Sequence, residues 1–175
     1  MIAPARRLAR LLTAHNLKVV FAESCTGGLV SGALTQIAGI SEHHCGGMVV
    51  YRNETKQQYL GIPRKLLDEH GAVSERVARE MATRILKATP EADYAASVTG
   101  HLGPNAPPKQ DGLVFIGVAH RTKPAADPSV YSLRCSPAES RTQRQKYIVI
   151  AVLLHLARVI EADVDAHPRS HAKRK

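Results

Sequence analysis

The chain has 175 residues, 44% of them hydrophobic, and a formal net charge of +9 at pH 7; this length and composition predict one globular domain with a substantial core. No apolar run is long enough to cross a bilayer, and the first residues lack the apolar core of a signal peptide. Three cysteines without a CxxC pair are typical of a reducing compartment, so we expect a cytoplasmic protein that does not associate with membranes.

The excess of basic over acidic residues is by itself weak support for nucleic-acid binding. Four of the cations lie in the last nine residues, 167–175, which contain no acidic residue, and such a terminal segment is usually solvated. Aromatic residues make up only 4% of the chain, which leaves few rings to stack on bases. We therefore expect a domain over residues 1–165 followed by a basic flexible tail over 166–175. An interaction module that uses this tail on nucleic acid is a less favoured alternative.

The hydrophobic pattern predicts alternating helices and strands. In chain order the pattern indicates a helix at 3–15, a strand at 17–22, a helix at 29–37, a strand at 46–52, helices at 54–59, 64–69 and 74–88, strands at 93–100, 112–120 and 129–135, and a helix at 139–161. Ser74 can cap the helix that follows it. Helices between the early strands and adjacent strands late in the chain predict an α/β fold, a three-layer α/β/α sandwich whose mixed sheet is mainly parallel.

Three polar turns follow predicted strands, and each contains residues that can do chemistry. The turns are ESCTGG (23–28), YRNETK (51–56) and TGHLGP (99–104). In sheets of this kind ligands bind beyond the carboxyl ends of the strands, where turns meet helix N-termini. The topology therefore predicts that the three turns form one site.

The ESCTGG turn carries hydroxyls on Ser24 and Thr26, and its glycines Gly27 and Gly28 allow close approach of a ligand to the backbone. The patterns of a Walker loop and of a dinucleotide site are both missing, so NTPase and Rossmann functions are disfavoured. A plain helix cap is an equally good explanation of the turn taken alone. Cys25, at the start of a helix, is a second candidate nucleophile, less favoured than Ser24.

The YRNETK turn supplies a candidate base for a serine nucleophile. A serine hydroxyl needs a base to remove its proton, and the amine of Lys56 can do this if its surroundings favour the neutral form. Tyr51 can bond to a planar ligand or flank it. The alternative for Lys56 is an ordinary surface lysine. The adjacent His43, His44 and Cys45 do not predict a metal site, because neighbouring strand residues face opposite ways and no second ligand pair has zinc spacing.

The segments AESCTGG, GGMVVYRNETKQQYLGI, EHGAVSERVAREMA and SVTGHLGP, in this order, resemble the CinA C-terminal domain family, the nicotinamide-mononucleotide deamidases. The resemblance runs from about residue 5 to residue 160. It implies hydrolysis of the carboxamide of nicotinamide mononucleotide to nicotinate mononucleotide and ammonia, without metal or cofactor. It also implies that Ser24 is the catalytic serine, Lys56 its partner and Tyr51 a further active-site residue. The substrate-binding positions that the comparison with this family suggests are Cys25, Thr26, Gly27, Gly28, Thr99, Gly100, Gly103 and, near the phosphate, Arg141.

One loop departs from the family pattern. The segment GPNAPPKQDG (103–112) is about two residues shorter than usual, lacks paired glycines and contains Pro107 and Pro108, while His101 replaces an apolar residue. Because prolines stiffen the chain and remove donors, the substrate loop is expected to differ in shape. A catalytically silent or specificity-shifted nucleotide-binding homologue is therefore the alternative to an active deamidase. The expected partner is a pyridine mononucleotide, and the exposed sheet edges of this fold class favour a homo-oligomer.

Overall fold

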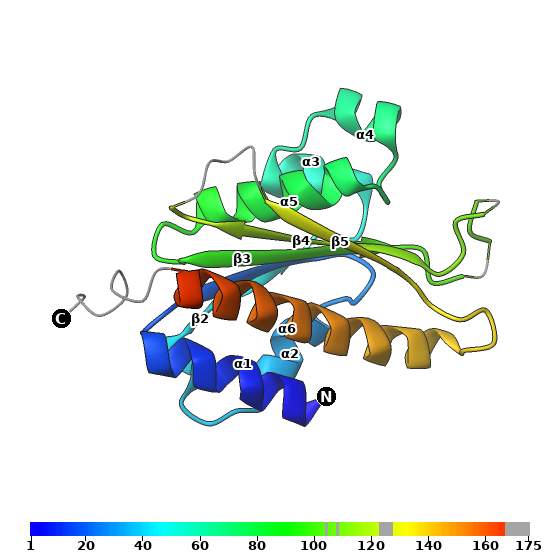
Figure 1. Ribbon diagram of the computed structural model, residues 1–175. Helices are drawn as coiled ribbons and strands as arrows, with labels where there is room; N and C mark the ends of the chain where they lie inside the picture. Colours follow the sequence, from blue (N-terminus) through cyan, green and yellow to red (C-terminus); the bar gives the residue numbers. More distant parts are fainter. Residues whose placement is uncertain (104, 108, 123–127, 167–175) are drawn as a thin grey trace.

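The computed structural model describes residues 1–103, 105–107, 109–122 and 128–166. A five-stranded sheet with helices on both faces forms the centre of the molecule (Figure 1). The strands are β1 (Val19–Glu23), β2 (His44–Val49), β3 (Tyr94–Gly100), β4 (Leu113–His120) and β5 (Ser129–Arg134). The helices are α1 (Ile2–His15), α2 (Leu29–Leu34), α3 (Asn53–Leu60), α4 (Arg64–His70), α5 (Glu75–Ala88) and α6 (Arg141–Ala166), with a short 3₁₀ turn, η1 (Ile40–Glu42).

The sheet is mixed, as the sequence predicts, with the strand order β2-β1-β3-β4-β5. Strand β1 pairs in parallel with β2 and with β3, whereas β3 with β4 and β4 with β5 are antiparallel. All strands except β4 therefore point in the same direction. Glu23, the last residue of β1, is in register with Val49 of β2 and Val98 of β3, so the segments that leave these three strands begin at one edge of the sheet.

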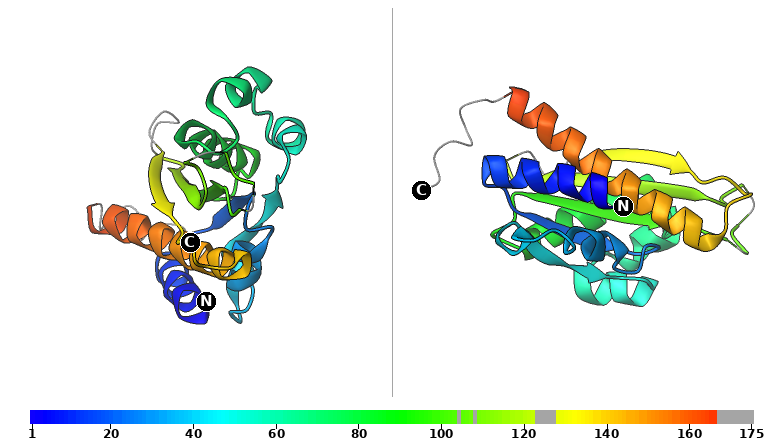
Figure 2. Two further views of the ribbon diagram at one scale, coloured as in Figure 1. Left: turned by 90° about the vertical axis from the view of Figure 1, so that its right-hand side faces the viewer. Right: turned by 90° about the horizontal axis from the view of Figure 1, so that it is seen from below.

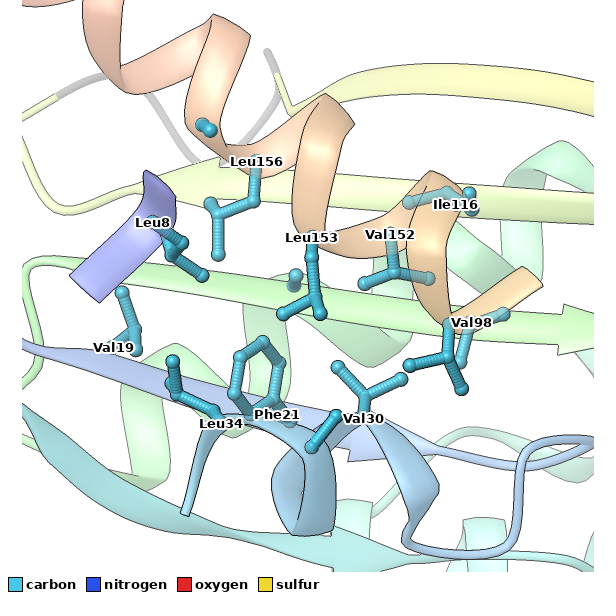
Figure 3. Packing of buried hydrophobic residues seen from close by; sticks show 14 of the residues in the cluster. Leu8, Val19, Phe21, Val30, Leu34, Val98, Ile116, Val152, Leu153 and Leu156 are labelled. Atoms are coloured by element: carbon cyan, nitrogen blue, oxygen red, sulfur yellow. The ribbon is translucent and has the colours of Figure 1, made fainter. Parts of the chain in front are cut away.

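Two apolar cores, one on each face of the sheet, hold the three layers together. Helices α1, α2 and α6 cover one face, and α3, α4 and α5 lie over the other (Figures 1 and 2). Figure 3 shows the first core, where Leu8 of α1, Phe21 of β1 and Leu153 of α6 pack together. Every residue of β1 is buried, which explains why this strand is an unbroken apolar run up to Glu23 rather than an alternating pattern.

The predicted elements are all present, with shifted ends. The second strand covers Val49 but not residues 50–52, because the chain turns there into α3. The helix predicted over 29–37 ends at Leu34. The last helix begins at Arg141 instead of residue 139, since the Ser140 hydroxyl accepts a hydrogen bond from the Gln143 N–H at 3.3 Å, and it continues to Ala166. Ser74 caps α5 as expected, accepting from the Val77 N–H. Residues 167–175, most of the predicted tail, lie outside the described residues.

Close packing of α5 on the sheet requires a glycine in β4. A Cβ atom at Gly117 would lie 2.7 Å from the Ala78 carbonyl oxygen and 2.8 Å from Ser97 Oγ. We expect Gly117→Ala to lower the free energy of unfolding by about 1–3 kcal/mol, because helix and sheet must separate to admit the methyl group. Urea denaturation measures this. Gly32→Ala in α2 is the control, since its Cβ would meet nothing within 4 Å; an equal loss in both variants would contradict the packing argument.

Candidate active site

The segments that leave β1, β2 and β3 surround a cavity of about 240 Å³. The start of α6 lies at the same end of the sheet as the loop that follows β3 (Figures 1 and 2), and it closes one side of the cavity with Arg141. Among the described residues the lining consists of Ser24, Cys25, Tyr51, Lys56, Ala72, Val73, Thr99, Gly100, His101, Leu102, Gly103, Asn105, Ala106 and Arg141. All three polar turns singled out in the sequence thus contribute side chains to one cavity.

Ser24 and Lys56, 32 residues apart in the chain, meet inside this cavity. The distance from Lys56 Nζ to Ser24 Oγ is 3.1 Å. The same Nζ lies 2.8 Å from the carbonyl oxygen of Val50 and 3.3 Å from that of Tyr51. A neutral amine has two N–H donors and one lone pair. With both donors on carbonyls, the lone pair is left to accept the Ser24 hydroxyl proton, so the arrangement suits a serine and its base.

Burial lowers the pKa of Lys56. Lys56 belongs to α3 and is only 1% exposed, and its amine reaches Ser24 just after β1 and the carbonyl of Val50 just after β2. Desolvation lowers the pKa of Lys56 from its ordinary value to about 8, with a smaller opposing effect from Cys25. A substantial fraction of the amine is therefore neutral slightly above neutral pH, and burial excludes the alternative of an ordinary surface lysine.

The lowered pKa of Lys56 makes stability depend on pH. Between about pH 8 and the ordinary lysine pKa of 10.5 the unfolded chain holds a proton that the folded chain has released, so the free energy of unfolding rises with pH in this window. Below pH 8 both states are protonated and the buried charge destabilises the fold. We expect the stability of the wild type relative to Lys56→Met to increase by about 2 kcal/mol between pH 7 and pH 10. Urea denaturation of both proteins at each pH tests this, and a pH-independent difference would contradict it.

A residue that the sequence analysis did not single out, Glu23, explains the ESCTGG turn. Its side chain is 2% exposed. Its Oε2 accepts hydrogen bonds from the Thr26 hydroxyl at 2.7 Å, the Gly28 N–H at 3.0 Å and the Val30 N–H at 3.1 Å, and its Oε1 accepts from the Ser31 N–H at 2.8 Å. Glu23 therefore satisfies donors that the start of α2 would leave unpaired. The sequence feature that could have predicted this role is an acidic residue at the end of an apolar strand, directly before a Gly-rich helix start, where a negative charge is favourable.

This arrangement corrects the expected role of the turn. The Thr26 hydroxyl and the Gly28 N–H both donate hydrogen bonds to the Glu23 carboxylate. The Gly27 N–H donates to the Ser24 carbonyl at 3.1 Å. Thr26, Gly27 and Gly28 do not line the cavity, so the prediction that they contact substrate with these groups is not supported. The N–H groups of Cys25 and Thr26 donate to no other residue in the part of the chain that the structure describes, and of these two residues Cys25 lines the cavity.

The Cys25 thiol is unsuited to act as the nucleophile. It is buried, and burial raises the pKa of Cys25 from its ordinary value to about 12. The reactive thiolate is therefore scarce at neutral pH. The Cys25 carbonyl accepts a hydrogen bond from Gln145 Nε2 at 3.1 Å, which ties the turn to α6.

The loop after β3 faces the turn that holds Ser24. Thr99 lines the cavity, and its hydroxyl donates to the Ala72 carbonyl at 2.7 Å, which fixes the loop before α5. The hydroxyl proton is therefore engaged, while the oxygen keeps lone pairs that can accept a hydrogen bond. A Cβ at Gly100 would lie 2.7 Å from Val114 Cγ2 and 3.3 Å from Cys25 Sγ, which explains the need for glycine there. Gly103 adopts a positive φ of 61° and its carbonyl accepts from Arg141.

Tyr51 and Arg141 form a polar pair at the exposed side of the cavity. One guanidinium nitrogen of Arg141 donates to the Tyr51 hydroxyl at 2.9 Å and another to the Gly103 carbonyl at 2.7 Å. Both side chains are exposed. Arg141 therefore joins the β2 and β3 segments while keeping a positive charge beside the cavity.

A second arginine of α6, Arg144, holds the 103–112 segment through Asp111. Arg144, itself buried, forms a bidentate ion pair with Asp111 at 2.7 and 2.9 Å and donates to the Ser136 carbonyl. Hydrogen bonding to Arg144 lowers the pKa of Asp111. Pro104 and Pro108 lie outside the described residues, whereas Asn105 and Ala106 line the cavity. The departure from the family pattern therefore falls directly on the site wall.

The histidines near β2 have structural partners. His43 Nδ1 bonds to the Leu17 carbonyl at 3.0 Å, and His44 Nε2 lies 2.6 Å from the Ser31 hydroxyl. Within the part of the chain that the structure describes, no three His, Cys, Asp or Glu side chains group closely enough to hold a metal ion. None of the helices in this described part of the chain has the length and apolar character needed to span a membrane.

Fold and site together define a three-layer α/β domain with a serine–lysine pair at the carboxyl edge of its sheet. The chain belongs to the CinA C-terminal domain family, whose model matches residues 2–160. A CinA-like protein of Leptospira borgpetersenii is 42% identical over 118 residues, which cover 66% of this chain and 28% of that protein.

Two solved structures extend the similarity over almost the whole chain. The competence/damage inducible protein CihA from Agrobacterium tumefaciens has a TM-score of 0.83 and 34% identity, with 91% of this chain and 94% of that one covered. A CinA superfamily protein from Klebsiella pneumoniae has a TM-score of 0.84 and 26% identity, with 91% and 97% covered. The chain spans less than a third of the length of the curated relatives that it matches.

Proposed function

We propose that this protein is a nicotinamide-nucleotide amidohydrolase that converts nicotinamide mononucleotide to nicotinate mononucleotide and ammonia. The observation that carries the proposal is the 3.1 Å approach of Lys56 Nζ to Ser24 Oγ. The resemblance of the turn sequences to nicotinamide-mononucleotide deamidases supports the choice of substrate. The cavity also contains an arginine and a tyrosine, which suit a phosphate and a planar ring.

The proposed reaction uses Ser24 as nucleophile and Lys56 as general base. The neutral amine takes the hydroxyl proton while Ser24 Oγ attacks the amide carbon, and the carbonyl oxygen becomes an oxyanion. The N–H group of Cys25, a residue that lines the cavity, stabilises this oxyanion. Lys56 then gives its proton to the departing nitrogen, ammonia leaves, and an acyl-enzyme remains. A water molecule, deprotonated by Lys56, hydrolyses the ester and restores the Ser24 hydroxyl.

Substrate orientation is assigned to the side chains at the exposed side of the cavity. Arg141 binds the 5′-phosphate as a bidentate donor, since it is the cation that the α6 start brings to the cavity wall. Tyr51, bonded to Arg141, flanks the pyridine ring. Gly100 also lines the cavity, and it has no room for a side chain because a Cβ atom there would meet Val114 and Cys25.

Ammonia release from nicotinamide mononucleotide by the purified protein tests the proposal. We expect turnover in the wild type, loss of turnover in Ser24→Ala, and retained turnover in Cys25→Ala; a thiol nucleophile would reverse the two variants. An inactive wild type that still binds pyridine nucleotides in a thermal-shift assay would favour the alternative, a catalytically silent or specificity-shifted nucleotide-binding homologue. The observation that supports this alternative is that Asn105 and Ala106, which belong to the segment that departs from the family pattern, line the cavity.

A further inference from the structure

Glu23 is a buried carboxylate beside the candidate nucleophile that the proposed mechanism does not use. It is the last residue of β1, and its main chain is held on both sides: its carbonyl accepts from the Val50 N–H at 2.8 Å, and the N–H of Ser24 donates to the Val98 carbonyl at 3.0 Å. The residues that follow have no such strand pairing. Gly27 and Gly28 adopt positive φ values of 63° and 96°, and glycines lose more conformational freedom on ordering than other residues.

The Glu23 side chain supplies the restraint that the backbone lacks. Its Oε2 joins the hydroxyl of Thr26 to the N–H groups of Gly28 and Val30, and its Oε1 takes the N–H of Ser31. One carboxylate thereby connects the middle of the turn to the first residues of α2. We infer that Glu23 is a positioning residue for Ser24, a buried anion that holds the 24–28 turn on α2 and so fixes Ser24 Oγ relative to Lys56 and to the Cys25 N–H group.

The charge of Glu23 fits a positioning role rather than a role in proton transfer. All four of its hydrogen bonds come from the turn and α2, whereas Lys56 Nζ contacts Ser24 Oγ and the carbonyls of Val50 and Tyr51. Glu23 is also not among the residues that line the cavity. The inference rests on the proposed function only in taking Ser24 as a nucleophile; it does not depend on the identity of the amide.

The test measures how fast a fluorophosphonate labels Ser24, which needs no knowledge of the substrate. In this reaction Ser24 Oγ forms a bond to phosphorus, fluoride leaves, and Lys56 accepts the hydroxyl proton. We expect Glu23→Gln to label about 10²-fold more slowly, because a displacement near 1 Å at a reacting atom costs about that much. Thr26→Val removes one donor and should slow labelling about fivefold. Glu42→Gln, at an exposed carboxylate of η1, removes the same charge and should label at the wild-type rate.

Two further readouts separate positioning from other roles. Amide hydrogen exchange over residues 26–31 should quicken in Glu23→Gln and not in Glu42→Gln. The pH at which the labelling rate falls to half should be the same in Glu23→Gln as in the wild type, because in both proteins Lys56 accepts the proton of Ser24. An unchanged labelling rate, a shifted pH midpoint, or a wild type that is not labelled at all would each overturn the inference. If labelling follows the expected order while no ammonia is released from nicotinamide mononucleotide, the proposed substrate fails and the role of Glu23 stands. Should Glu23→Gln not fold, Thr26→Val decides by the same criteria.

Discussion

Replacing Lys56 with methionine is expected to lower kcat/KM for nicotinamide mononucleotide by roughly 10²–10⁴-fold, the usual contribution of a positioned general base. Methionine fills a similar volume without a titratable group, and the Ser24 hydroxyl then loses the amine that lies 3.1 Å from it. Steady-state ammonia release measures the loss. In the wild type the acid limb of the pH–rate profile should lie near pH 8, where burial places the Lys56 pKa.

Lys56→Arg distinguishes a base from a mere positive charge at this position. Arginine keeps the charge but does not deprotonate in this pH range, so we expect a loss as large as in Lys56→Met. Lys65→Met, at an exposed lysine of α4, serves as the matched control and should retain full activity. An arginine variant with more than a tenth of wild-type turnover would show that Lys56 acts through its charge and would remove the Ser24–Lys56 mechanism.

Arg141→Ala is expected to lower kcat/KM for nicotinamide mononucleotide by about 10–100-fold, the magnitude of a charge-assisted hydrogen bond. With nicotinamide riboside, which carries the same amide but no phosphate, the same variant should change kcat/KM far less. The ratio of the two kcat/KM values therefore isolates the contact between the guanidinium and the phosphate. Raising the salt concentration should weaken this contact in the wild type, because Arg141 is exposed.

Arg141 also holds neighbouring groups of the cavity in place. Comparing the two substrates separates this structural effect from phosphate binding. Its guanidinium donates to the Tyr51 hydroxyl and the Gly103 carbonyl, and loss of these bonds would affect mononucleotide and riboside equally. Tyr51→Phe removes only the hydroxyl and reports that contribution. Arg64→Ala, at an exposed arginine of α4, is the control for charge. Equal losses with both substrates in Arg141→Ala would contradict phosphate binding.

Much of the fold follows from local sequence pattern. The apolar run before Glu23 predicts a buried strand, and the stripe of Val77, Met81 and Ile85 predicts the helix that packs on the sheet. Element ends were less predictable because caps and turns decide them: Ser140 moves the start of α6, and the turn into α3 shortens β2. The convergence of three turns at one edge was also predictable, since parallel strands present their carboxyl ends together.

The sequence by itself therefore determined the elements, their order and the candidate pair Ser24 and Lys56, because periodicity, strand ends and residue chemistry are properties of short segments. Only the tertiary structure decided that Lys56 is buried, that the Thr26 hydroxyl bonds to Glu23 rather than lining the cavity, and that Arg141 reaches Tyr51 across 90 residues. The physical reason is that burial, and the partner that each donor finds, depend on segments distant in the chain. Strand pairing and helix packing bring those segments together, and no local pattern encodes the distance between their side chains.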